Sequence, residues 1–325
     1  MGEGEGLAAR LKRTLPPDGW RTRFAPAPTG YLHLGHLVNA LHVWGIARAY
    51  GGQVLLRIED HDRTRSRPEY ETALLEDLQW LGLDGDVGTC ASFSERPHAQ
   101  RQSDQETRYA SALAQLQSRG LVYPCRCTRK EIAKATTRVS GDELWYPGTC
   151  RNAHVPPEES FARRVQIDGG TELFDDLRLG PLSQDPSQQC GDLLVRDRHA
   201  NWTYQFAVSV DDAEQQIDVV IRGEDLLAST GRQRRLAQLL GRASLPLTLH
   251  HALLRHPDGT KLSKANGDTA LRARRGLGAT PAMLFGEAAH LVGLQATPRP
   301  IEVDEIAALF RETGALRGVC APADA

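Results

Sequence analysis

Two histidines and a glycine near the start of the chain could together bind an anion. His33 and His36 lie three residues apart in the sequence HLGH, with Gly35 between them, directly before a run of residues with helical periodicity. A helix N-terminus offers free N–H groups and a positive dipole end, and imidazoles can donate hydrogen bonds to phosphate oxygens. Gly35 lets a ligand lie close to the backbone. The pattern predicts a nucleotide phosphate site, with two surface histidines on an ordinary helix cap as the alternative.

A second polar segment, HPDGTKLSKANGD at residues 256–268, carries two lysines close together. Lys261 and Lys264 lie in a stretch too rich in glycine and asparagine to favour a helix. Two ammonium groups on such a loop could close over the phosphates of a bound nucleotide. Taken alone, the segment fits a solvated charged loop equally well.

HLGH followed by KLSK resembles the two signature motifs of the class I aminoacyl-tRNA synthetases. The flanking sequences look like the glutamyl branch of that family: RFAPAPTG at 23–30, RIEDHDRTR at 57–65, VDD at 210–212 and VIRGEDLL at 220–227. The resemblance covers roughly residues 21–266. It implies a Rossmann-like fold, ATP used with Mg²⁺, and catalytic roles for His33, His36 and Lys264. It also implies an ATP site formed by His33, Gly35, His36, Lys261 and Lys264.

Charged residues in the flanking motifs suggest an amino-acid pocket. Arginine can bind a substrate carboxylate with a bidentate fork, and a carboxylate can bind an α-amino group. Arg23 and Glu59 are the candidates, with a pair of solvated charges at strand ends as the alternative. The family resemblance implies a glutamate pocket lined by Arg23, Phe24, Ala25, Pro26, Ala27, Glu59, Tyr204 and Arg222. Ala27 departs from the serine often found there, which removes one possible hydroxyl contact.

Three of the six cysteines lie close together in the sequence. Cys125 and Cys127 are separated by one residue, and Cys150 follows in WYPGTCR. Three thiolates and one further ligand make a tetrahedral structural zinc site, with three free cysteines as the alternative. Glutamyl-queuosine synthetases resemble this pattern with a tyrosine as fourth ligand, which here would be Tyr146. On chemical grounds alone His154 is the rival, because a phenol with a pKa of about 10 must lose a proton or bind weakly.

These residues require a scaffold in which strands and helices alternate. Pro26, Pro28 and Gly30 predict a turn between a strand and the helix that starts near HLGH. Further elements are predicted as strands at 53–58, 202–210 and 217–221 and as helices at 69–81, 99–121 and 229–240. We therefore expect an α/β fold with a Rossmann-like parallel sheet, and ligands bound beyond the carboxyl ends of its strands.

Five regions are expected along the chain. They are a flexible lead-in at 1–20, the first half of the catalytic domain at 21–121, an inserted zinc-binding, acceptor-type subdomain at 122–200, the second half of the catalytic domain with the KLSK loop at 201–266, and a helical C-terminal region at 267–325. Within the insertion, the polar and poorly periodic stretch 160–190 is expected to lead the chain back to the sheet.

The composition suits a globular enzyme rather than a strongly charged nucleic-acid binder. The 325 residues are 40% hydrophobic and 25% charged, and the formal net charge is −2. An RNA partner would therefore be held by local basic patches, for which the candidates are Arg126, Arg129, Lys130, Arg232, Arg234 and Arg235. Six cysteines without a secretory signal predict a reducing, cytoplasmic compartment, and no apolar run is long enough for a membrane helix.

The region after residue 266 is too short for a separate anticodon-reading domain, which would need roughly another 100 residues. This short architecture and the CxC…Y…C pattern look like the glutamyl-queuosine tRNA(Asp) synthetases. The resemblance implies ATP-dependent activation of L-glutamate and its transfer to queuosine in the anticodon loop of tRNA(Asp), by a monomer without membrane contact. Two alternatives remain: a truncated glutamyl-tRNA synthetase that charges tRNA(Glu), and a synthetase-like binding protein that has lost its chemistry.

Overall fold

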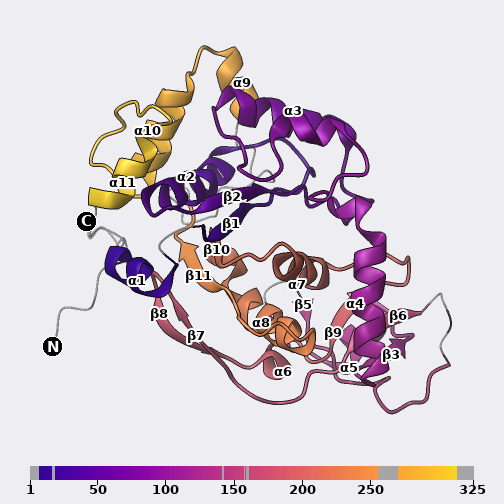
Figure 1. Cartoon of the computed structure of the whole chain (residues 1–325). Helices are drawn as coiled ribbons and strands as arrows, with labels where there is room; N and C mark the ends of the chain where they lie inside the picture. The colour runs from indigo at the N-terminus through magenta and orange to yellow at the C-terminus, as the bar shows by residue number, and fades with distance from the viewer. Residues whose placement is uncertain are drawn as a thin grey trace.

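The computed structural model describes residues 7–16, 19–140, 143–156, 158, 161–254 and 270–312. At its centre are the parallel strands β1 (Arg21–Phe24), β2 (Gln53–Leu56), β10 (Val219–Gly223) and β11 (Leu247–His251). β1 pairs with β2 and β10 pairs with β11, while Asp218 N donates to Arg21 O (2.8 Å) where β10 begins beside β1. The strands predicted at 53–58 and 217–221 are confirmed, as is the α/β fold with a parallel sheet (Figure 1).

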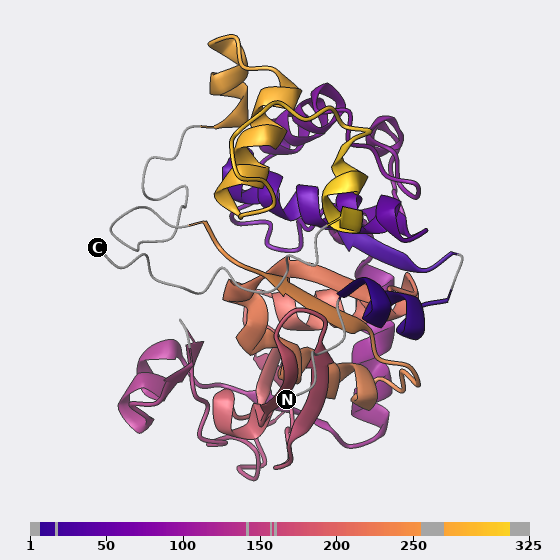
Figure 2. The same cartoon turned by 90° about the vertical axis from the view of Figure 1, so that its left-hand side faces the viewer.

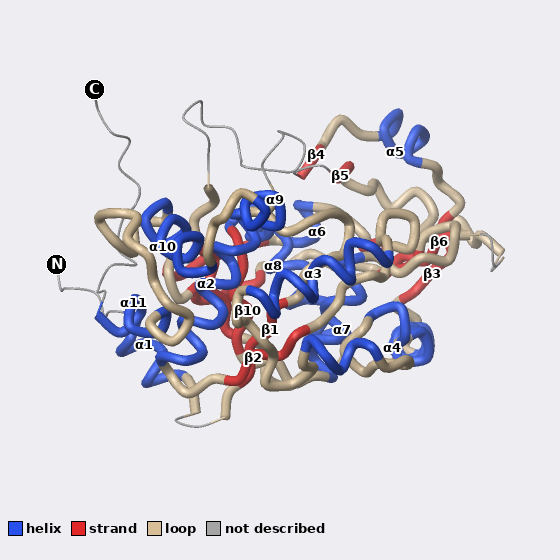
Figure 3. Tube along the Cα trace, turned by 90° about the horizontal axis from the view of Figure 1, so that it is seen from above, coloured by secondary structure: helices blue, strands red, loops and turns tan. Residues whose placement is uncertain are grey.

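Helix α2 (Leu34–Ala49) lies between these strands and the C-terminal helices α10 (Pro281–Leu291) and α11 (Ile306–Glu312). The apolar side chains that give this helix its periodicity are at most 4% exposed, namely Leu37, Val38, Leu41, Trp44 and Ile46. A Cβ atom at Gly45 would lie only 2.2 Å from the Phe310 ring, so glycine is what allows α11 to approach this closely. In the view from above, α2 and α10 lie over the strands (Figure 3). The predicted helix is confirmed, and its burial fixes the place of the HLGH turn at its start.

The expectation of a flexible lead-in is wrong for residues 7–14, which form helix α1 (Leu7–Thr14). Leu11 is 1% exposed, and Trp20, also 1% exposed, donates from Nε1 to Tyr50 O at 2.8 Å. Arg10 donates to Leu177 O (3.0 Å). The apolar residues in this stretch are few and widely spaced, so their packing against the rest of the chain was not visible in the local pattern.

After β2 the chain forms two α-helices and two short 3-10 helices. They are α3 (Pro68–Trp80), the short 3-10 helices η1 (Cys90–Ser94) and η2 (Gln102–Asp104), and α4 (Glu106–Ser118), which packs against α7 (Tyr204–Glu214) and β3 (Val122–Cys125). The helix predicted at 69–81 is confirmed, whereas the one predicted at 99–121 begins only at Glu106. Residues 100–102 instead pair with the end of β2: Ile58 N donates to Gln100 O (3.0 Å) and Gln102 N donates to Ile58 O (3.1 Å).

The stretch 122–200 contains a three-stranded antiparallel sheet of β3 (Val122–Cys125), β6 (Ala162–Val165) and β9 (Leu193–Arg196). It also contains α5 (Arg129–Ala135), the short strands β4 (Val139–Ser140) and β5 (Glu143–Leu144), and α6 (Pro186–Gln189). Figure 2 shows these elements on the side of the molecule opposite to the C-terminal helices. Helix α5 begins with a capping box, because Thr128 Oγ1 accepts from Glu131 N and the Glu131 carboxylate accepts from Thr128 N.

The expectation that residues 160–190 form a poorly periodic connection is wrong. Besides β6, they contain the hairpin of β7 (Glu172–Asp176) and β8 (Gly180–Gln184), and β7 pairs with β11 at Asp176 and Thr248. Burial alternates strictly along β7, but two of its inward residues are the carboxylates Glu172 and Asp176. They accept hydrogen bonds from Arg235 and His250. Because these buried residues are polar, the sequence does not show the alternation of apolar and polar residues that indicates a strand.

The predicted strand at 202–210 is wrong, because these residues enter helix α7 (Tyr204–Glu214). Every residue from Gln205 to Asp212 is buried, and a short run buried on all sides gives no period by which helix and strand differ. The helix predicted at 229–240 is confirmed as α8 (Thr230–Leu239), preceded by η3 (Glu224–Ser229), and α9 (Leu271–Gly276) opens the C-terminal region. None of the helices in the described ranges is long and apolar enough to cross a membrane.

Candidate active site and metal centre

A cavity of about 410 Å³ opens beyond the carboxyl ends of β1, β2 and β10. Its lining includes all the residues proposed for glutamate, namely Arg23, Phe24, Ala25, Pro26, Ala27, Glu59, Tyr204 and Arg222. Gly35 and His36 line it as well, whereas His33 lies beside it with its ring 4.0 Å from that of His36. Residues from five separate stretches of the chain therefore meet at the sheet edge where the α/β pattern placed the ligand.

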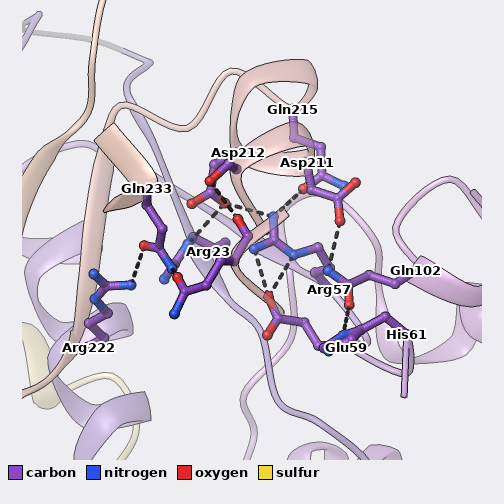
Figure 4. Close-up of polar contacts among 12 residues, drawn as sticks. Arg23, Arg57, Glu59, His61, Gln102, Asp211, Asp212, Gln215, Arg222 and Gln233 are labelled. Atoms are coloured by element: carbon purple, nitrogen blue, oxygen red, sulfur yellow. Dashed lines mark hydrogen bonds and ion pairs between the residues drawn. The ribbon is translucent and has the colours of Figure 1, made fainter. Parts of the chain in front are cut away.

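Arg57, which the sequence analysis left without a role, links the cavity residue Glu59 to residues of helix α7 and its C-terminal end (Figure 4). Its side chain is fully buried and donates to Glu59 Oε1 (2.9 Å), Asp212 Oδ1 (2.8 Å) and Gln215 Oε1 (2.8 Å). The described hydrogen bonds to the Glu59 side chain all use Oε1, which leaves Oε2 for another donor. An arginine inside a strand predicted to be buried was the available signal, because a buried charge requires fixed partners.

The Arg23 side chain, which lines the cavity, contacts Asp212, the carboxylate that also binds Arg57. Its Nε lies 3.3 Å from Asp212 Oδ1 and its NH1 donates to Ile221 O (3.4 Å), with 4% of the residue exposed. Burial would raise the pKa of the Asp212 carboxyl, but the charges of Arg23 and Arg57 outweigh burial and hold that pKa below its ordinary value. Asp212 is therefore an anion that fixes both guanidinium groups.

The neighbouring carboxylate of the VDD motif, Asp211, also accepts several hydrogen bonds inside the protein. It is fully buried and accepts from Arg108 NH1 (2.8 Å), Tyr109 Oη (2.7 Å) and Gln102 Nε2 (2.8 Å). Gln102 in turn lies 2.6 Å from Nδ1 of His61, which lines the cavity (Figure 4). The two aspartates of VDD are structural groups that secure α7 against β2 and α4.

Arg222 differs from the other two arginines because its described hydrogen bonds go to neutral groups. Nε donates to His250 Nε2 (3.0 Å), NH1 donates to Gln233 Oε1 (2.7 Å) and NH2 donates to Thr230 Oγ1 (2.8 Å). The residue is 3% exposed, and burial lowers its pKa. A guanidinium carries five N–H donors, so these contacts orient Arg222 without neutralising it. Such a cation, facing a cavity, favours an anionic ligand.

The HLGH turn caps helix α2 with its own histidines. His33 is the N-cap residue, and its Nδ1 accepts from Gly35 N at 3.0 Å. His36 Nδ1 accepts from His33 N at 3.2 Å, which completes a reciprocal capping box. Because both Nδ1 atoms accept, the proton of each neutral imidazole is on Nε2, a suitable donor for phosphate oxygens. Lys261 and Lys264 lie outside the described residues.

The three clustered cysteines come together as a candidate metal centre. The Sγ atoms of Cys125, Cys127 and Cys150 all lie within 4.8 Å of one another. Burial, with the neighbouring thiols, raises the pKa of Cys127 to about 12. A divalent cation would reverse this effect, because a coordinated thiol is deprotonated. The donor set therefore fits a thiolate-binding metal ion.

Tyr146 lies in this cluster, and His154 does not belong to it. The Tyr146 hydroxyl is 3.3 Å from Cys125 Sγ and 3.8 Å from Cys127 Sγ, and it accepts from Cys150 N at 2.9 Å. Among the described residues, the group of closely spaced metal-binding atoms contains the three thiols and no histidine nitrogen. Of the two candidates left open by the sequence, the geometry favours Tyr146 as the fourth ligand.

Residues 20–311 match the family model described as tRNA synthetases class I (E and Q), catalytic domain. The chain belongs to this family. The synthetase-type sheet, with HLGH at the start of α2 and the cavity beside it, agrees with that assignment. The resemblance inferred from the motifs is thus confirmed, and so is the ligase class that it implies.

Several relatives are similar to this chain over most of its length. Glutamyl-Q tRNA(Asp) synthetase of Symbiobacterium thermophilum is 41% identical over 302 residues, which cover 89% of this chain and 91% of that protein. The protein of the same name from Ralstonia nicotianae is 41% identical over 288 residues, covering 86% of each. Glutamate–tRNA ligase 2 of Syntrophus aciditrophicus is 38% identical, and the match covers 83% of this chain and 57% of that protein.

Solved structures of the same family share the fold. The structure of a glutamate tRNA ligase from Elizabethkingia meningosepticum in complex with its amino acid matches with a TM-score of 0.73 and 25% identity. The match covers 89% of this chain and 64% of that one, so the chain spans just under two thirds of the length of that ligase. Glutamate-tRNA synthetase from Elizabethkingia anophelis matches with a TM-score of 0.72 at 24% identity, which concerns the fold alone.

Proposed function

We propose that this class I synthetase-family chain activates L-glutamate with ATP and transfers it to queuosine in the anticodon loop of tRNA(Asp). The observation that carries the proposal is the cavity in which Arg23, Glu59 and Arg222 meet beyond the strand ends. Relatives that match most of the chain and are named glutamyl-Q tRNA(Asp) synthetase support it.

The cavity suits an amino acid with two carboxylates and one ammonium group. Arg222, a buried cation with neutral described partners, would bind one carboxylate, and Arg23 lies beside it. Glu59, with Oε1 fixed by Arg57, would accept from the α-ammonium group through Oε2. The family resemblance implies that all three residues line the glutamate pocket.

In the activation step, an α-carboxylate oxygen of glutamate attacks the α-phosphorus of ATP, and pyrophosphate leaves. The step requires alignment and stabilisation of charge more than it requires a strong base. His33 and His36 would donate from Nε2 to phosphate oxygens, with Gly35 keeping the backbone open. Lys261 and Lys264 would bind the phosphates and the departing pyrophosphate, and ATP would be used as its Mg²⁺ complex.

In the transfer step, a hydroxyl oxygen of the queuosine cyclopentene ring attacks the glutamyl carbonyl carbon. The bond from that carbon to the AMP oxygen breaks, AMP leaves with the electron pair, and the hydroxyl proton is released. Zinc, held by Cys125, Cys127, Tyr146 and Cys150, would be structural and would join the end of β3 to the loop before Cys150. Because tRNA and ATP are the substrates, we place the protein in the cytoplasm.

The test is transfer of labelled glutamate, with ATP, to three RNAs: tRNA(Asp) bearing queuosine, tRNA(Asp) without it, and tRNA(Glu). Label on the queuosine tRNA alone is the expected result. Label on tRNA(Glu) would instead identify a compact glutamyl-tRNA synthetase and overturn the proposal. If no RNA were labelled, glutamate-dependent ATP–pyrophosphate exchange would separate a failed acceptor assignment from an inactive protein.

A further inference from the structure

A second cavity, of about 380 Å³, lies between the cysteine-bearing insertion and helix α7. Its walls come from the start of α5, from strands β6 and β9, and from the first residues of α7. Tyr204 lines both this cavity and the candidate glutamate pocket. The two cavities are therefore neighbours that share Tyr204 in their walls.

One wall of this second cavity contains a buried cation with unused hydrogen-bonding capacity. Arg164 is 8% exposed, and its NH1 donates to Asp192 O at 2.8 Å. Its Nε is buried without a hydrogen-bond partner, and the guanidinium carbon lies 3.7 Å from the centre of the Tyr146 ring. Arg164 is thus a largely buried cation whose described partners are a carbonyl oxygen and an aromatic ring, and an anion or a hydrogen-bond acceptor bound in the cavity would stabilise it.

The carboxylates that line the cavity are already engaged within the protein. Asp192 accepts from Tyr123 Oη (2.6 Å) and from Arg151 Nε (2.8 Å). Asp197 accepts from Asn201 N (2.8 Å) and Asn201 Nδ2 (3.0 Å). Arg151 therefore compensates the charge of Asp192, and the three arginines of the lining outnumber the one remaining carboxylate, Asp197.

Two exposed arginines stand at the edge of the same cavity, Arg129 and Arg198. Arg198 NH2 donates to Arg126 O (3.3 Å), which holds it against the start of the cysteine segment. With Arg164 inside, the cavity combines an apolar surface, formed by residues such as Ile132 and Leu194, with positive charge at its rim. A nucleoside within an RNA chain has a base with apolar faces and polar edges and is linked to an anionic phosphate on either side, and it matches this arrangement.

We propose that the second cavity receives the acceptor nucleoside of the RNA during the transfer step. This inference rests on the proposed function, since it requires a glutamyl group activated in the first cavity. A hydroxyl on a base held beside Tyr204 would reach the glutamyl carbonyl past the edge of that side chain, since Tyr204 lines both cavities. The phosphates next to the nucleoside would lie at Arg129 and Arg198, and the Arg164 guanidinium would donate to an acceptor atom of the base.

Filling the cavity should block transfer and spare activation. Leu194→Trp places a larger side chain in the wall, outside the cavity proposed for glutamate. Leu194 packs against the cluster that contains Cys125, Tyr146 and Cys150, so the metal content of the variant is measured together with its activity. We expect glutamate-dependent ATP–pyrophosphate exchange to stay within about threefold of wild type, while transfer to queuosine tRNA(Asp) falls at least about 10²-fold, the effect of misplacing a reactant by about 1 Å. Leu173→Trp, at a strand position that is 71% exposed and outside both cavities, is the matched control.

A second variant tests the same cavity without placing a larger side chain in it, so its result does not depend on whether the protein folds around that side chain. Arg198→Glu reverses an exposed charge at the rim, and we expect the KM for the tRNA to rise about tenfold with unchanged exchange. Arg299→Glu, an exposed arginine in the C-terminal region, makes the same charge change as its control. Normal transfer by both Leu194→Trp and Arg198→Glu would overturn the proposal.

Direct binding distinguishes a failure of this inference from a failure of the proposed function. Free queuosine nucleoside is the probe, and its binding is measured by calorimetry with wild type and with Leu194→Trp. We expect binding to wild type that Leu194→Trp weakens at least about tenfold, whatever the outcome of the transfer assay. Equal binding to both proteins, or none to wild type, would overturn the cavity assignment, whereas wild-type binding without transfer would point to an error in the proposed reaction.

Discussion

His250 donates from Nδ1 to Asp176 Oδ2 at 2.7 Å, and through this contact strand β7 fixes the orientation of Arg222 in the cavity proposed for glutamate. Both side chains of the pair are fully buried. Hydrogen bonds from the backbone N–H groups of Arg178 and Leu179 and from His250 hold the pKa of Asp176 low despite burial, so the carboxylate accepts the Nδ1 proton. His250 Nε2 is then the acceptor for Arg222 Nε at 3.0 Å. The pair makes His250 a neutral group with a fixed tautomer.

Asp176→Asn should therefore weaken glutamate binding without direct contact to glutamate. The amide lacks the charge that favours the Nδ1–H tautomer, so Arg222 loses a defined acceptor at Nε. In ATP–pyrophosphate exchange we expect the KM for glutamate to rise about tenfold, the usual scale for an outer-shell partner. The KM for ATP should change little.

The adjacent residue supplies the control for this variant. Asp175→Asn makes the same chemical change at a side chain that is 56% exposed, and its ion pair with Arg10 should contribute less than about 1 kcal/mol. A folded Asp176→Asn protein with an unchanged KM for glutamate would show that the Asp176–His250 pair does not position Arg222.

The cysteine cluster should hold about one zinc ion per chain. Cys125→Ser should lose that metal and melt at a lower temperature, because the ion joins segments separated in sequence. Cys90→Ser, at a buried cysteine outside the cluster, should keep it. Metal analysis of purified protein together with thermal unfolding measures both effects, and a metal-free, fully folded wild type would contradict the assignment.

The fourth ligand can be decided by two further variants of the same centre. Tyr146→Phe removes the hydroxyl that lies 3.3 Å from Cys125 Sγ, and we expect it to weaken zinc affinity about tenfold or more. His154→Ala should leave the affinity unchanged, because His154 is not among the closely spaced donors. Competition with a chelator gives the affinities, and the reverse result would make His154 the ligand.

Local patterns in the sequence were sufficient to predict the HLGH turn and the sheet strands at 53–58 and 217–221. The HLGH turn, helix α2 and the strand at 53–58 depend on neighbouring residues, so their capping and periodicity could be recognised without the tertiary structure. The residues of the glutamate pocket came from family resemblance. Their convergence on one cavity could not be inferred from spacing, since Arg23 and Arg222 lie on different strands.

The parts that the sequence did not predict depend on long-range partners. Glu172 and Asp176 face inward because Arg235 and His250 compensate them, and those partners lie 63 and 74 residues away. Arg57 is buried because Asp212, which is 155 residues away, accepts its hydrogen bond. Helix α7 is buried on every side, which removes the polar face that would have revealed its period. Each feature arises from contacts that no local window contains.

Two buried histidines should make the folded state sensitive to acid. Burial, with smaller contributions from neighbouring charges, lowers the pKa of His42 from 6.5 to about 3 and that of His251 to about 4. Below pH 6.5 the unfolded chain binds protons that these folded histidines exclude. Stability therefore falls as pH drops from 6.5 toward 4, by up to about 1.4 kcal/mol per pH unit for each group.

Urea unfolding at pH 7.5, 6 and 5 measures this dependence. His42→Leu removes one buried titrating group and should show a smaller loss of stability between pH 7.5 and pH 5 than wild type. His290→Gln, at an exposed position, should follow the wild-type dependence. If His42→Leu lost as much stability as wild type over this range, burial of His42 would not be a cause of the acid sensitivity.

Gly35→Ala should reduce activation while leaving stability almost unchanged. A Cβ atom at this position would lie 2.9 Å from Cε1 and 3.1 Å from Nδ1 of His33, so the ring must move and its hydrogen bond from Gly35 N is lost. The lost cap costs about 1 kcal/mol, but alanine in the first helical turn recovers about the same amount over glycine. The displaced imidazole no longer donates where phosphate charge develops, so exchange should fall at least about tenfold.

Gly276→Ala provides the matched control, because a Cβ at this helical glycine meets nothing within 4 Å. Wild-type exchange by Gly35→Ala would mean that the ring position set by the HLGH turn does not matter for catalysis.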